Sequence, residues 1–106
     1  MINLTFKEFE EYLDANLGSK RIFFEKAMDD QIRRNARRQP AKRWNEAKLE
    51  RAVDRMWTDM ARSIYDKFKI TIKAKSSDPY QEWVEFFEKN DAIENLDEMM
   101  TDLEFE

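Results

Sequence analysis

Apolar side chains recur every three or four residues through most of this chain, which is the spacing of one face of an α-helix. The longest such stretch runs from Leu49 to Phe68 and follows Asn45, a residue suited to cap a helix. The pattern predicts an all-α fold, a four- to five-helix bundle around this long helix. We expect one domain spanning residues 1–106, because the chain is too short for two.

Residues that favour helix ends divide the rest of the chain into further helices. Thr5 and Glu8 have the spacing of a capping box at the start of the first helix, which we expect to run to about Leu17. Gly18 is expected to close that helix in the left-handed conformation. Further helices are expected to begin after three N-cap residues: Ser19, Asp78 and Asp91.

Residues 70–74 interrupt the helical spacing, because they are largely β-branched and their apolar positions alternate. A short strand or an extended linker is expected here. Ile2 and Leu4 alternate as well, so a minimal two-stranded β pairing between the N-terminus and residues 70–74 is an alternative.

The centre of the core is expected on the long helix. Its apolar spacing predicts that Val53, Met56, Met60 and Ile64 are fully buried. The same spacing argument assigns most of the large aromatic residues to the core, Trp44 among them.

The composition removes several kinds of catalytic site. The chain has no cysteine, no histidine and a single glycine, which excludes Ser-His and Cys-His triads, thiolate zinc sites and glycine-rich phosphate loops. Adjacent carboxylates such as Asp29 and Asp30 point about 100° apart on a helix and form no catalytic dyad. We therefore expect no enzymatic activity, no cofactor and no metal site. Apolar runs of at most three residues also predict a cytoplasmic protein with no membrane contact.

The charge is segregated along the chain. Residues 20–75 carry 17 bases and eight acids, whereas residues 76–106 carry one base and eleven acids. A basic middle followed by an acidic helical segment, residues 79–106, is the main indication of a partner. The alternative is that the acidic segment folds onto the basic one and neutralises it.

The bases are densest between Gln31 and Trp44, where no acidic residue occurs. Like charges four residues apart destabilise a helix, and this cost indicates a function such as binding phosphates or an acidic protein face. The structural alternative is favourable interaction with a helix C-terminus. We call these residues the basic cluster: Arg33, Arg34, Arg37, Arg38, Lys42 and Arg43.

Acidic residues recur about once per helical turn in residues 79–106. A regular row of carboxylates can imitate the phosphates of DNA and occupy the basic groove of a nucleic-acid enzyme. The alternative is the solvated face of two amphipathic helices, although such faces usually mix both signs of charge. We call these residues the acidic row: Glu82, Glu85, Glu88, Asp91, Glu94, Asp97, Glu98 and Asp102.

Three functions fit these observations. The first is a non-enzymatic phage or mobile-element protein that binds and blocks a host nucleic-acid enzyme through its charged faces, as antirestriction and anti-CRISPR proteins do. The second is a phage head, neck or tail subunit whose copies pair basic to acidic face as a homo-oligomer. The third is a nucleic-acid-binding regulator that uses residues 33–43. Sequence alone favours the first, with a protein partner that has a basic groove, because the sequence pI is near 5.0.

Overall fold

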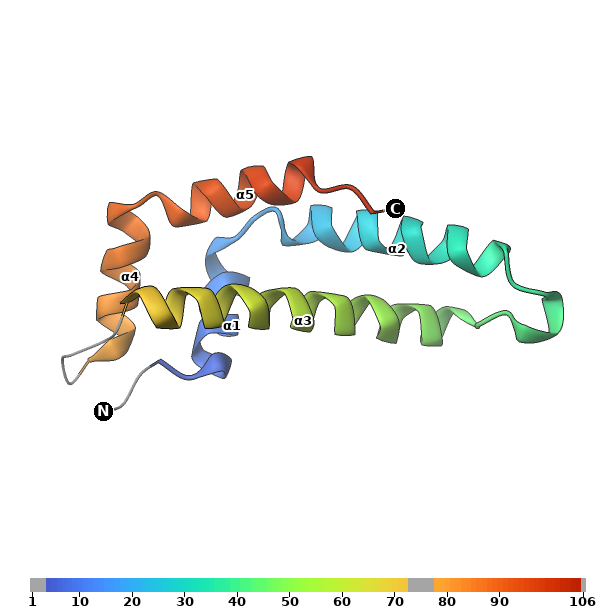
Figure 1. Cartoon of the computed structure of the whole chain (residues 1–106), viewed down its shortest axis with the longest axis horizontal. Helices are drawn as coiled ribbons and strands as arrows, with labels where there is room; N and C mark the ends of the chain where they lie inside the picture. The colour runs from blue at the N-terminus through green and yellow to red at the C-terminus, as the bar shows by residue number, and fades with distance from the viewer. Residues whose placement is uncertain (1–3, 73–77, 106) are drawn as a thin grey trace.

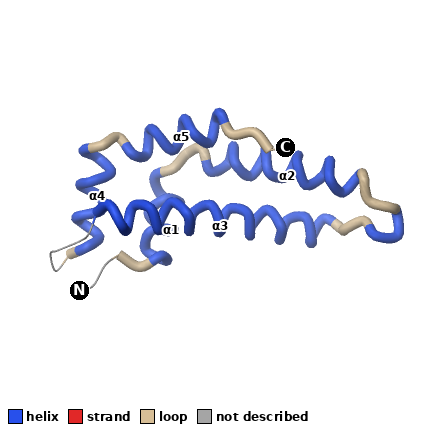
Figure 2. Tube along the Cα trace, viewed as in Figure 1, coloured by secondary structure: helices blue, strands red, loops and turns tan. Residues whose placement is uncertain are grey.

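The computed structural model describes residues 4–72 and 78–105, and these residues form helices and loops without a strand (Figure 2). The all-α part of the expected fold is confirmed. The elements are α1 (Phe6–Asn16), α2 (Lys20–Ala36), the short 3-10 helix η1 (Pro40–Lys42), α3 (Glu46–Ile72), α4 (Pro79–Lys89) and α5 (Ala92–Asp102).

The molecule is elongated, with extents of 55 × 26 × 21 Å. Helices α2 and α3 lie side by side and are joined by residues 37–45, so they form a long helical hairpin (Figure 1). Helices α1 and α4 pack near the other end of α3, and α5 returns from α4 along the first half of α2. The far end of the hairpin therefore projects beyond the other helices.

The core of α3 follows a four-residue spacing, with Leu49, Val53, Trp57, Ala61 and Tyr65 buried. The expected burial is right for Val53 and wrong for the other three positions, which are half-buried and flank the core: Met56, Met60 and Ile64. A row of residues four apart rotates by about 40° per step around the helix. The buried direction rotates with it, because α3 faces α2 along its first half and α1 and α4 near its end.

Two other expectations about local structure are wrong. Residues 70–72 form the last turn of α3 instead of a strand, and Ile70 is 72% exposed. Residues 73–74 and Ile2 of the expected β pairing lie outside the described residues. Gly18 is not left-handed; the only positive φ among the described residues is that of Asp91, at 51°.

Three of the expected side-chain N-caps are confirmed, whereas the side chains of Ser19 and Asp91 make no capping hydrogen bond. The Thr5 hydroxyl accepts from the backbone N–H of Glu8 at 3.2 Å, and the Glu8 carboxylate accepts from the backbone N–H of Thr5 at 3.2 Å. Asn45 caps α3 by accepting from Lys48, and Asp78 caps α4. These devices are local, so sequence spacing was sufficient to find them.

Candidate functional site

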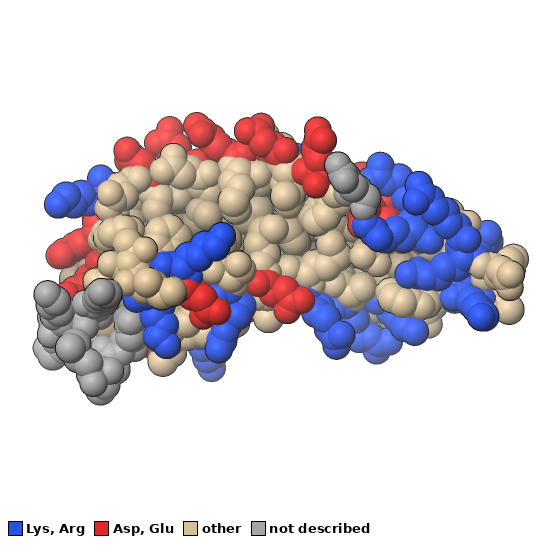
Figure 3. All heavy atoms as spheres, in the orientation of Figure 1, with Lys and Arg blue, Asp and Glu red and all other residues tan. Residues whose placement is uncertain are grey.

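The basic cluster lies at the projecting end of the hairpin, remote from α1 and α4. Arg33 and Arg34 are in the last turn of α2, Arg37 is its C-cap, and the other three members lie in the connection to α3. Figure 3 shows the Lys and Arg side chains gathered at this end of the molecule.

The connection is held in place by a pair of hydrogen bonds between Asn35 and the backbone of Trp44. The Asn35 Oδ1 atom accepts from the Trp44 N–H at 2.8 Å, and the Asn35 Nδ2 group donates to the Trp44 carbonyl at 3.0 Å. Arg43 also donates to the carbonyls of Ala36 and Arg38, at 3.3 and 3.2 Å. The loop is therefore tied to the C-terminal end of α2 at several points.

Trp44 is half-buried at this end, and cations lie over its ring. The Arg38 guanidinium is 3.9 Å from the ring centroid, and the Lys48 ammonium is 4.6 Å from it. Arg38 also donates to Asn35 Oδ1 at 2.9 Å, so its position is fixed from two sides. The expectation that Trp44 belongs to the core is wrong, because the loop carries it away from the cluster of buried residues.

Three cations that sequence reasoning left out of the basic cluster join it in space. Lys48, Arg51 and Arg55 are exposed on one face of α3. The spacing of these bases, three and then four residues, was the available signal. Acidic residues also lie on these turns of α3: Glu50 is about 100° around the helix from Arg51, and Asp54 is about 60° from it. We call the basic cluster together with Lys48, Arg51, Arg55 and Trp44 the basic tip.

A groove of about 430 Å³ runs beside Trp44 on the α3 side of the basic tip. A second groove of about 470 Å³ lies along residues 41–45 and shares Trp44, Lys48 and Arg51 with the first, so the two adjoin. We call the first one the Trp44 groove, and its lining residues are Gln31, Trp44, Lys48, Arg51, Ala52, Arg55, Met56 and Asp59.

The α2 side of the basic tip is partly neutralised by a buried carboxylate. Asp30 is 4% exposed and pairs with Arg34 at 2.8 Å and with Arg33 at 3.9 Å. Phe105 lies against the same arginines. The loop and α3 side of the tip has no such buried acid among the residues that the structure describes.

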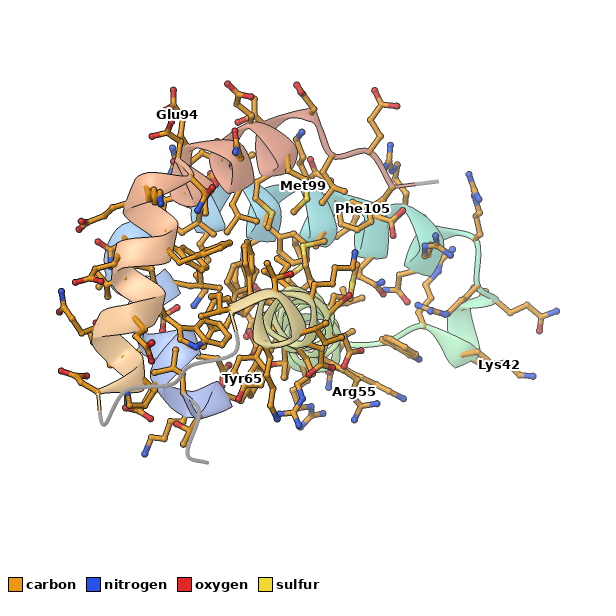
Figure 4. The ribbon with its side chains drawn as sticks, turned by 60° about the vertical axis from the view of Figure 1, so that its left-hand side comes forward. Lys42, Arg55, Tyr65, Glu94, Met99 and Phe105 are labelled. Carbon is orange, nitrogen blue, oxygen red and sulfur yellow. The ribbon has the colours of Figure 1, made fainter. Side chains whose placement is uncertain are left out.

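The acidic row does not form one continuous line. Helix α4 runs across the end of the molecule and α5 along its length, so the row changes direction at the left-handed residue Asp91 (Figure 1). On α5 three exposed carboxylates four residues apart face outward: Glu94, Glu98 and Asp102. Figure 4 shows Glu94 at the top pointing away from the other helices, Arg55 projecting below α3 and Lys42 projecting at the right-hand end.

Some members of the acidic row have structural roles. Asp97 is half-buried and accepts a hydrogen bond from the backbone N–H of Ser19 at 3.1 Å. Burial raises the pKa of the Tyr12 hydroxyl above its usual value of 10.0, and the nearby charge of Glu88 adds to the rise. Glu82 is half-buried, while Glu85 and Glu88 are exposed on α4.

Internal pairing of the two charged surfaces is absent from the described part of the chain. No ion pair within 4.0 Å there joins a member of the acidic row to a member of the basic cluster. The two surfaces instead face solvent on different parts of the molecule (Figure 3).

No family model matches this chain, and no curated protein or solved structure matches it either. Within residues 4–72 and 78–105, no three acidic side chains gather closely enough to hold a metal ion. In the same ranges, no helix is both long and apolar enough to cross a membrane.

Proposed function

We propose that this chain is a non-enzymatic nucleic-acid-binding protein that contacts phosphates through its basic tip. The observation that carries the proposal is that six cations from the loop and α3 lie around Trp44, with three more on the α2 side of the same end of the hairpin. Arginine forks and lysine ammonium groups gathered on one surface are the electrostatic footprint of phosphate binding. This is the regulator alternative of the sequence analysis, with three more cations than the sequence indicated.

The overall negative charge does not oppose this function at physiological salt. Ions screen exposed charges over about 8 Å at 0.15 M. The molecule is 55 Å long, and the outward carboxylates of α5 lie along its length, not at the tip. A phosphate at the loop and α3 side of the tip therefore interacts mainly with the charges beside it, and in the Trp44 groove these are three cations and the carboxylate of Asp59.

The test is fluorescence anisotropy with labelled single-stranded and duplex 20-mers at about 150 mM salt. The variant Arg37→Gln, Lys42→Gln, Arg51→Gln, Arg55→Gln removes four exposed cations from the tip. The matched control Lys7→Gln, Arg21→Gln, Lys67→Gln, Lys89→Gln changes the net charge equally with exposed positions elsewhere. We expect at least a tenfold loss of affinity for the tip variant and little change for the control. Equal losses for both variants, or no binding by the unmodified protein, would contradict the proposal.

A second candidate function is inhibition of a nucleic-acid enzyme by the acidic face of α5. It is favoured by the exposed row Glu94, Glu98 and Asp102, in which successive carboxylates rise about 6 Å along the helix. That rise is close to the distance along the helix axis between every second phosphate on one strand of DNA, about 7 Å. The partner is a basic groove, as in proteins blocked by antirestriction or anti-CRISPR inhibitors.

This candidate is tested by DNA-cleavage assays with host restriction and CRISPR nucleases. The triple variant Glu94→Lys, Glu98→Lys, Asp102→Lys is expected to fold and to lose inhibition, because it reverses the field of the row. The triple variant Glu11→Lys, Glu50→Lys, Asp54→Lys has the same net charge and serves as the control. If the unmodified protein inhibits none of these nucleases, the candidate is wrong.

A further inference from the structure

We propose that the Trp44 groove holds a base of single-stranded nucleic acid, with the neighbouring phosphates bound by Lys48, Arg51 and Arg55. This inference rests on the proposed function and adds the form of nucleic acid and the way it is held. It starts from the composition of the groove, in which an aromatic ring and three cations outweigh a single carboxylate, that of Asp59. A ligand that joins a flat ring to an anionic group matches this combination, and a nucleotide is such a ligand.

The two cations over the Trp44 ring are held differently. Arg38 is half-buried and hydrogen-bonded to Asn35, and it lines neither groove. Lys48 is exposed and lines both grooves. A base can therefore reach the groove side of the ring by displacing the flexible Lys48 ammonium group, which then meets a phosphate. Arg38 stays in contact with the ring and keeps it in position.

The groove has the size and the continuation that a strand requires. Its volume of about 430 Å³ lies within the range of pockets that hold small organic ligands. The second groove continues from it past Lys42 and Arg43, so a chain of phosphates can pass along both. A free mononucleotide would use only one of the two.

A single strand fits this site better than a duplex. Base faces in a duplex are covered by their neighbours, and exposing one costs unstacking energy, whereas a single strand offers bases for stacking. The basic tip also presents a loop and a 3-10 turn between two long helices, not a short helix suited to the major groove. We therefore expect a single strand to bind more tightly than a duplex, and the experiment below measures both.

The experiment compares four fluorescein-labelled probes on the unmodified protein: a thymidine 20-mer, a uridine 20-mer, a 20-base-pair duplex and an abasic 20-mer with the same phosphates. We expect the single strands to bind at least tenfold more tightly than the duplex and the abasic chain. The deoxy and ribo probes distinguish DNA from RNA. Equal binding of the abasic and base-carrying strands would overturn the inference, because phosphates alone would then account for affinity.

Variants of Trp44 test the stacking directly. Trp44→Leu keeps an apolar side chain and is expected to lose about tenfold or more in single-strand affinity, and Trp44→Phe to recover most of it. The unmodified protein should show fluorescence quenching on binding that Trp44→Phe lacks. If Trp44→Leu binds single strands as tightly as the unmodified protein does, the groove assignment is wrong while the proposed function stands. If no probe binds the unmodified protein, both are wrong.

Discussion

The carboxylate of Asp97 caps a helix whose N-cap residue, Ser19, lies 78 residues earlier in the sequence. Its Oδ1 atom accepts from the backbone N–H of Ser19, directly before α2, at 3.1 Å. The Ser19 side chain makes no capping hydrogen bond of its own. Helix α5 therefore supplies the partner that satisfies an N-terminal amide of α2, and the bond joins the acidic segment to the first half of the chain.

Replacing Asp97 by alanine is expected to lower the free energy of unfolding by about 1 kcal/mol or more, because the Ser19 amide loses its acceptor. Glu98→Ala is the matched control, since Glu98 is exposed on the next position of the same helix. Its effect should stay within about 0.5 kcal/mol. Urea unfolding followed by circular dichroism measures both. Equal midpoints for the two variants would show that the Asp97 bond contributes nothing.

A charge at Ala61 is expected to unfold the protein. Ala61 is 0% exposed, and an unpaired carboxylate there costs several kcal/mol against a total stability of about 5–15 kcal/mol. Ser63→Asp places the same charge on an exposed position of α3 and should leave the melting temperature almost unchanged. Thermal unfolding provides the measurement. An unchanged melting temperature for Ala61→Asp would contradict the packing described for α3.

Stability is expected to fall above about pH 10 because of a buried tyrosine. Burial raises the pKa of the Tyr65 hydroxyl above its usual value of 10.0, and this hydroxyl donates to the Leu4 carbonyl. A pKa raised by folding gives a contribution that is complete below the unfolded pKa and is lost as pH rises through the folded pKa. The loss of stability is measured by the midpoints of urea unfolding between about pH 8 and pH 11, a range that includes the ordinary pKa of tyrosine.

The variant Tyr65→Phe is the control for this pH dependence. It should be less stable at neutral pH by about 1 kcal/mol, since the Leu4 carbonyl loses its donor. Above about pH 10 it should then lose less stability than the unmodified protein does. The loss of stability that the variant still shows is due in part to Tyr12, whose pKa is also raised. Identical pH profiles for both proteins would rule out a contribution from Tyr65.

Asn35→Ala is expected to loosen the basic tip without unfolding the molecule. The substitution removes both hydrogen bonds to the Trp44 backbone and the bond from Arg38. Hydrogen exchange at the Trp44 amide should accelerate about tenfold or more, because each lost bond is worth about 1 kcal/mol. Gln39→Ala, at an exposed loop position, should leave that rate unchanged. Unaltered exchange in Asn35→Ala would show that the loop is held by other contacts.

The parts of the fold that could be predicted are those set by neighbouring residues. The Thr5–Glu8 capping box and the Asp78 cap depend on positions three apart, and both are present. The cap of α2 could not be predicted in the same way, because its acceptor is Asp97 on a distant helix. Helical continuation to Ile72 likewise overrides the local β preference of β-branched residues.

The candidate site was predictable in composition but not in shape. The basic cluster is contiguous in sequence, so its presence was evident, whereas its union with Arg51 and Arg55 required the reversal of the chain between α2 and α3. The regular spacing of the acidic row predicts a single line of carboxylates. The left-handed backbone at Asp91, a conformation that an aspartate adopts at moderate cost, turns that line into two.

The basic tip and the acidic face of α5 lie on different parts of the molecule, which makes the molecule an electric dipole whose orientation near a polyanion depends on ionic strength. At about 0.01 M salt the screening length is about 30 Å, so an approaching strand senses much of the molecule and its net negative charge. At about 0.15 M it senses only the nearest end. For the proposed function, physiological salt thus favours an approach in which the basic tip leads, whereas in dilute buffer the net negative charge opposes the first encounter.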